Sequence, residues 1–140
     1  YRAIFLSGEL PDGAQPAPEL VGVIIDHLVY VQRRKLEGIL DAKLSGLFFA
    51  NQAATIAEIE ALFEGSGGPD GYSFFDVMID RGFAAEADQL RADLVAASSA
   101  AEAETRSGLV GTLRNLELDL REVLPDALGI ELGIEFADGD

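Results

Sequence analysis

Side chains that could perform chemistry are few in this chain of 140 residues, and most of them are carboxylates. The chain has no cysteine, which excludes a disulfide framework, a thiolate nucleophile and a cysteine-ligated metal. His27 is the only histidine, and Tyr30 stands where an H-x-x-E metal pattern would need a glutamate. Because His27 lies beside an apolar stripe, we expect a half-buried residue hydrogen-bonded to a neighbour; a ligand or a general base is the alternative.

Any metal site in this chain would rely on oxygen ligands, which suits hard cations such as calcium or ferric iron. The compact candidate is Asp138-Gly139-Asp140, in which two carboxylates flank a glycine and can fold around a cation. The alternative is that these residues form an acidic, solvated end of the chain. Serine chemistry has no support, because no serine lies in a G-x-S-x-G elbow. The segment 65–68, Gly-Ser-Gly-Gly, lacks the lysine of a phosphate-binding loop.

The composition indicates one folded, acidic domain. A hydrophobic content of 49% over 140 residues is enough for a buried core and excludes a disordered acidic tail. The formal charge is −15, from 25 acidic and 10 basic residues, which argues against a nucleic-acid partner. The only basic cluster, Arg33-Arg34-Lys35, is expected to form a solvated face. No apolar run reaches the roughly 20 residues of a transmembrane helix.

Apolar residues recur with helical spacing along most of the chain, and the pattern does not support a pair of strands. We expect helices over residues 18–40, from 51 or 55 to 65, over 73–82, over 83–97 and over 100–124. Pro18 would be the first residue of the first helix, and residues 43–50 a dense apolar turn. The capping-box spacing S/T-x-x-E/D predicts helix starts at Thr55, Ser73 and Ser99.

The last third of the chain is predicted to hold the longest helix. Five leucines, at positions 109, 113, 116, 120 and 124, recur at intervals of four, three, four and four. Pro125 would stop this helix, because proline cannot donate the next backbone hydrogen bond. The tail after it alternates apolar residues with glutamate, glycine and alanine, so it should be extended and pack back onto the bundle. The apolar residues of the tail are Ile130, Leu132, Ile134 and Phe136.

These elements predict an all-α protein, an antiparallel up-down helical bundle with a short extended C-terminal tail. The apolar stripes would face inward and the acidic surplus outward. We expect residues 1–17, rich in proline and glycine, to be a connector, and residues 18–140 to be the bundle. Because the chain begins with Tyr1, we also expect a segment upstream, either a removed signal peptide or more of a longer protein.

Two stretches of this chain resemble the imelysin-like proteins, a family also classed as M75 peptidases. The segment 128–140, Leu-Gly-Ile-Glu-Leu-Gly-Ile-Glu-Phe-Ala-Asp-Gly-Asp, is similar to the family's closing leucine-glycine step, apolar run and Asp-Gly-Asp. Upstream, the segments 34–37, 43–45 and 61–65 resemble a stretch in which phenylalanine-serine-asparagine leads into a helix that ends in an aromatic residue and glycine. Ser45 matches the serine of that stretch.

The resemblance covers about residues 28–140 and corresponds to the C-terminal half of the family. Leu47 stands where the family has asparagine, and Glu135 replaces another asparagine, so a polar role of those asparagines is not carried over. The family's G-x-H-x-x-E motif, proposed to bind metal, belongs to the other half and is absent from this chain.

The resemblance implies a periplasmic, outer-membrane-associated or lipid-anchored protein of the bacterial cell envelope, built of two helical halves and linked to iron uptake. It implies that the chain helps bind a metal or an iron-related ligand, with iron, zinc or calcium bound through the full-length protein. Partners would be a missing N-terminal half of the same protein and an envelope or iron-uptake component. Ligand-binding candidates are Ser45 and His27, and metal candidates are Asp138 and Asp140. The alternatives are a metallopeptidase, as the family name suggests, and a structural or adaptor bundle without catalysis.

Overall fold

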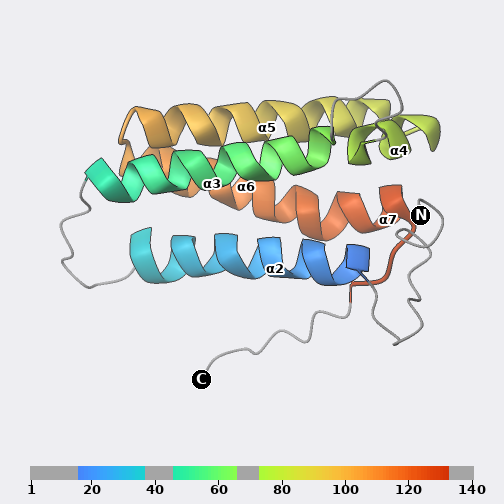
Figure 1. The fold of residues 1–140 in the computed structure, drawn as a ribbon, viewed down its shortest axis with the longest axis horizontal. Coiled ribbons are helices and arrows are strands. Elements are labelled where there is room, and N and C mark those ends of the chain that lie inside the picture. The colour runs from blue at the N-terminus through green and yellow to red at the C-terminus, as the bar shows by residue number, and fades with distance from the viewer. Residues whose placement is uncertain (1–15, 37–45, 66–72, 133–140) are drawn as a thin grey trace.

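The computed structural model describes residues 16–36, 46–65 and 73–132, and within them the chain is helical with short connecting turns (Figure 1). The helices are α2 (Pro16–Tyr30), α3 (Gly46–Glu64), α4 (Phe74–Asp80), α5 (Ala84–Glu102), α6 (Arg106–Leu118) and α7 (Leu124–Leu128), with π-helical turns η1 (Val31–Leu36) and η2 (Asp119–Val123). No strand occurs in these described ranges. The prediction of an all-α helical bundle is confirmed.

The long helices α2, α3, α5 and α6 make the bundle. In Figure 1 the chain passes from right to left along α2, back along α3, again to the left along α5, and to the right through α6 and α7. The most extensive contacts are those of α5, with α3 on one side and α6 on the other, and α2 packs on α6. The short α4 lies at one end of the bundle, against α5 and α7. None of the helices described is long and apolar enough to cross a membrane.

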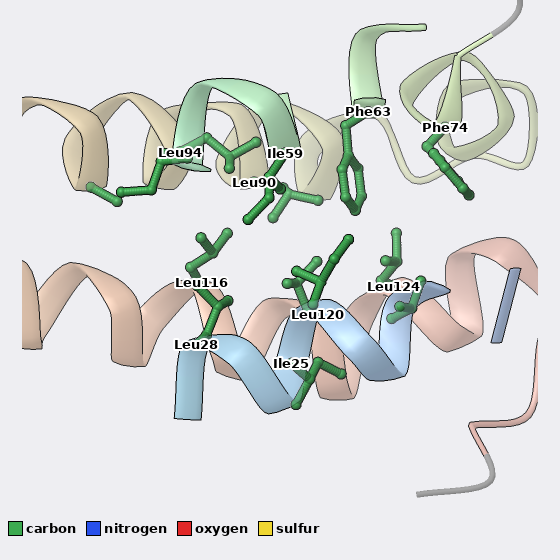
Figure 2. Packing of buried hydrophobic residues seen from close by; sticks show 14 of the residues in the cluster. Ile25, Leu28, Ile59, Phe63, Phe74, Leu90, Leu94, Leu116, Leu120 and Leu124 are labelled. Carbon is green, nitrogen blue, oxygen red and sulfur yellow. The ribbon is translucent and has the colours of Figure 1, made fainter. Parts of the chain in front are cut away.

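The core consists of aliphatic side chains in layers, closed at one end by aromatic rings (Figure 2). Leu28 of α2 and Leu116 of α6 both belong to this core, and both are at most 2% exposed. At the closed end the ring centroids of Phe63 and Phe74 are 5.1 Å apart. Full burial of such a side chain contributes about 1.5–3 kcal/mol to folding. These layers therefore fix the relative positions of the helices.

α2 begins at Pro16, two residues before the predicted start at Pro18. Both prolines fall in the first turn, where the missing N–H removes no intrahelical hydrogen bond. The α-helical geometry ends at Tyr30, and the chain continues as the π-helical turn η1 to Leu36. The rest of the predicted helix, residues 37–40, lies outside the described part of the chain.

α3 begins at Gly46, so the predicted turn over residues 43–50 is wrong in its described part. Phe49 is 5% exposed and Ile56, seven residues on, is 1% exposed, which places both on the buried face of one helix. Thr55 consequently lies inside α3, and its capping-box spacing marks no helix start. Packing of α3 along α5 outweighs this local signal.

α5 continues through the serine pair to Glu102, so the predicted break before residue 100 is wrong. Ala101 is fully buried and extends the apolar stripe past Ser99, which points outward and is tolerated in the helix. The chain turns instead at Glu104, whose φ is +52°, and α6 starts at Arg106. Burial of the alanine stripe therefore decides where this helix ends.

Pro125 does not stop the last helix, contrary to the prediction. The π-helical turn η2 precedes it, and there the N–H of Leu124 donates to the carbonyl of Asp119, five residues back. Pro125 then occupies the first turn of α7, where a residue without an N–H is tolerated. The helix ends at Gly129, whose φ of +64° is left-handed. The predicted tail thus begins after Gly129, and its residues 133–140 lie outside the described part of the chain.

The predicted helix start at Ser73 is confirmed. The Oγ atom of Ser73 accepts the N–H of Asp76 at 3.0 Å, while Oδ2 of Asp76 accepts the N–H of Ser73 at 2.9 Å, which completes a capping box. Gly82 follows α4 with a φ of +91°. Gly65, after α3, has a φ of +75° and donates its N–H to the carbonyl of Ala61 at 3.0 Å.

Candidate functional site

Two aspartates meet inside the bundle, at the contact between α5 and the π-helical turn η2. Asp93 lies on the buried face of α5, between Leu90 and Leu94, and is 8% exposed. Asp119 is the first residue of η2 and is half-buried, and its carboxyl group is within hydrogen-bonding reach of that of Asp93. Asp93 and Asp119 together form what we term the carboxyl pair.

Burial is the largest cause of the raised pKa of Asp119. Desolvation raises the pKa of Asp119, the hydrogen bond to Asp93 raises it further, and the negative charges of Asp93 and Glu122 bring the pKa to about 6. Two ionised carboxylates cannot donate to each other, and the buried Oδ2 atom of Asp119 has no hydrogen-bond partner among the described residues. One proton shared by the pair supplies the donor that the ionised form lacks.

The polar neighbours of the carboxyl pair are neutral, acidic or already engaged. Nε2 of Gln89 donates to Oδ2 of Asp93 at 2.9 Å, one turn earlier on α5. Glu117, 8% exposed, accepts from Nη2 of Arg121 at 2.8 Å, an ion pair that spans the junction of α6 and η2. The charges that shift the pKa of Asp119 are those of Asp93 and Glu122, and both are negative. Ionisation of both carboxylates is therefore poorly compensated.

The π-helical turn keeps Asp119 close to the core. Leu116, Leu120 and Leu124 are spaced by four residues, and all three are fully buried. An α-helix has 3.6 residues per turn, so residues four apart drift around its surface, and the wider π turn takes up that drift. Asp119 consequently stays beside the buried leucines. Single π turns are frequent at functional sites of proteins.

His27 is the one residue of the predicted site that the structure describes. It is half-buried in the last turn of α2, and its Nε2 atom is buried without a hydrogen-bond partner among the described residues. The predicted hydrogen bond from His27 to a neighbouring residue is therefore not found at Nε2. The residue after it, Leu28, is buried in the core.

The other candidates, Ser45, Asp138 and Asp140, lie outside the described residues. Of the predicted ligands, His27 alone can therefore be placed in the bundle. In the basic cluster, Arg33 and Lys35 are exposed, which agrees with the predicted solvated face.

The carboxyl pair was not predicted, although the sequence carries a signal for half of it. Asp93 stands three residues after Leu90 and four before Ala97, inside the stripe that was predicted to be buried. A charged residue is rarely buried in such a stripe without a partner. The sequence does not indicate the π-helical turn, and that turn is what holds Asp119 against α5.

The arrangement can hold and release one proton near neutral pH. Its oxygen atoms also suit a hard cation. However, the described residues contain no group of three or more histidine, aspartate or glutamate side chains that could hold a metal ion. The carboxyl pair therefore offers proton chemistry.

Comparisons with models of protein families, with curated proteins and with solved structures find no match for this chain. The resemblance to imelysin-like proteins consequently rests on the two matched stretches of sequence, and it remains a prediction.

Proposed function

We propose that this chain is a helical domain of an imelysin-like protein of the bacterial cell envelope, and that it helps bind a metal ion or an iron-related ligand together with an N-terminal half. The observation that carries the proposal is the segment 128–140, in which leucine-glycine, an apolar run and Asp-Gly-Asp follow in the family's order. The segment around Ser45 adds a second match, in the correct relative position. The all-α fold of the described residues supports the proposal, because the family is built from helical bundles.

The leucine-glycine step of this segment has a structural reason in the bundle. Leu128 is fully buried, and Gly129 ends α7 with a φ of +64°, which residues with a side chain adopt only at a cost. A Cβ atom on Gly129 would also displace Nη1 of Arg81, the end of a flexible side chain that donates to the carbonyl of Ala127 at 3.5 Å. The turn therefore favours glycine at this position, whatever ligand the domain binds.

The proposal assigns mainly oxygen ligands to this half of the protein. Asp138, Asp140 and the hydroxyl of Ser45 are the candidates from sequence, and His27 could add a nitrogen through its buried Nε2 atom. In the proposal the N-terminal half completes the site. The histidine and glutamate of that half's G-x-H-x-x-E motif would be its contribution. Iron, calcium and zinc are the cations that suit such a mixed set.

Metal titration followed by calorimetry tests the proposal. Ferric iron, zinc and calcium are added separately to this chain and to a longer form that carries the N-terminal half. We expect tight binding only in the longer form, and binding about tenfold weaker there in an Asp138→Asn, Asp140→Asn double variant. Asp126→Asn, which changes an exposed carboxylate on α7, is the matched control and should bind normally.

Two results would contradict the shared site. One is tight binding by this chain alone, and the other is unchanged binding by the double variant in the longer form. A peptidase assay of the longer form, before and after replacement of the histidine of its motif, separates the proposal from the metallopeptidase alternative. Activity that depends on this histidine would favour the peptidase.

A further inference from the structure

The carboxyl pair has a property that goes beyond the proposed function and does not depend on it. We propose that Asp93 and Asp119 form a proton-operated lock between α5 and η2, which holds while the pair shares one proton and loosens when both carboxylates are charged. The lock joins α5, which contacts both α3 and α6, to the turn that leads into α7.

The burial of the two residues is the first support for the lock. Asp93 is 8% exposed and its carboxyl group already accepts from Gln89, so that group is held in place. The Oδ2 atom of Asp119 is buried and has no hydrogen-bond partner among the described residues. A charged carboxylate in this position has lost water without gaining a donor, which is unfavourable. A shared proton removes that penalty and links the two helices.

The surrounding charges further disfavour the ionised form of Asp119. The elements packed against Asp119 are α5, α6, α2 and α7. The titratable groups of these elements and of η2 include Asp93, Glu117, Arg121, Glu122, His27, Asp26 and Asp126. Arg121 is ion-paired with Glu117, and Asp26 and Asp126 are exposed to solvent. The charges that act on Asp119 are those of Asp93 and Glu122, and both repel its ionised form.

The direction of the pH effect follows from proton binding. The pKa of Asp119 is about 6 in the folded chain and 3.8 in an ordinary aspartate. Between these values the folded protein holds a proton that the unfolded chain has released, so stability falls as the pH rises. The contribution of the lock is complete below the lower value, declines as the pH passes through the higher one, and is largely lost by about pH 7.

Loosening the lock acts directly on the π turn. The carbonyl of Asp119 accepts the N–H of Leu124, and this hydrogen bond closes η2. Repulsion between the two carboxylates therefore acts on the residue whose carbonyl closes η2. We therefore expect η2 to open more often when the pair is fully charged, and the amide of Leu124 to lose protection from hydrogen exchange.

Urea unfolding of the full chain at several pH values between about 4.5 and about 7.5 tests the lock. Over this range the unfolding equilibrium constant should rise about tenfold more in the natural chain than in Asp119→Asn, because the amide of the variant cannot titrate. Asp126→Asn, which changes an exposed carboxylate seven residues further on, should keep the pH dependence of the natural chain. Equal pH dependence of the natural chain and Asp119→Asn would overturn the proposal.

Two further measurements keep the proposal testable if Asp119→Asn does not fold. Asp93→Asn places a permanent amide donor opposite Asp119, so it should also flatten the pH dependence; retention of the full dependence would overturn the lock. A carbon-13 NMR titration of the Asp119 carboxyl in the natural chain should have its midpoint near 6. A midpoint below about 4.5 would show that no proton is held, and the lock would then be wrong.

Discussion

Gly129 and Gly111 lie on the same C-terminal stretch of helix but differ in backbone conformation. Gly129 has a φ of +64° and faces Arg81, whereas Gly111 lies inside α6 with no atom within 4 Å of an added Cβ. We expect Gly129→Ala to lower the free energy of unfolding by about 1–2 kcal/mol, because alanine is strained at positive φ. Gly111→Ala should raise it by about 0.5–1 kcal/mol, since it reduces the entropy of the unfolded chain.

Urea unfolding of both glycine variants at a single pH checks this pair. Effects of the same sign would show that the left-handed turn at Gly129 is not present in solution.

At the scale of single residues the sequence was informative about turns, because glycine is favoured where the backbone adopts a positive φ. It was much less informative about the carboxyl pair. Asp93 could have been flagged as a charge inside an apolar stripe, but its partner Asp119 is placed by a π turn that no local pattern indicates.

Helix boundaries in this chain are set by capping only where packing allows it. Ser73 and Ser99 have the same spacing to an acidic residue three positions later, yet only Ser73 begins a helix. We expect Ser73→Ala to lower the free energy of unfolding by about 1 kcal/mol, because it removes the capping box of α4. Ser99→Ala, the matched control in the exposed interior of α5, should change it by less than about 0.5 kcal/mol.

Thermal or urea unfolding of the two serine variants separates these cases. A loss of stability at Ser99 as large as that at Ser73 would mean that α6 begins at Ser99.

The existence and type of the helices could be predicted, since the 3.6-residue period of apolar residues is a property of the core itself. The ends of α3, α5 and α6 could not be predicted. Burial of Phe49 extends α3, and burial of Ala101 extends α5, past local signals that would otherwise end them. The π turn before Pro125 continues the helical chain from α6 into α7.

The bundle as a whole is held by one continuous apolar core that runs from α2 to the residues after α7. α7 contacts α4, and its end is joined to α4 by the hydrogen bond from Arg81 to the carbonyl of Ala127. The start of the tail is therefore part of the core. This position bears on the adaptor alternative, in which the tail would dock on a partner. Leu128 and Ile130 are already buried in the chain's own bundle.

Truncation after Leu124 tests how much the end of the chain contributes to the whole molecule. The truncation removes Leu128, fully buried, and Ile130, 8% exposed, and each such side chain contributes about 1.5–3 kcal/mol. We expect a loss of about 3–6 kcal/mol, a large share of the 5–15 kcal/mol typical of a domain, visible as a lower urea midpoint or loss of the cooperative transition. Leu118→Ala, at a leucine that is 45% exposed, is the control for loss of an apolar side chain and should cost far less. An unchanged urea midpoint after truncation would contradict the assignment of these residues to the core, and it would return the tail to the role of a docking segment.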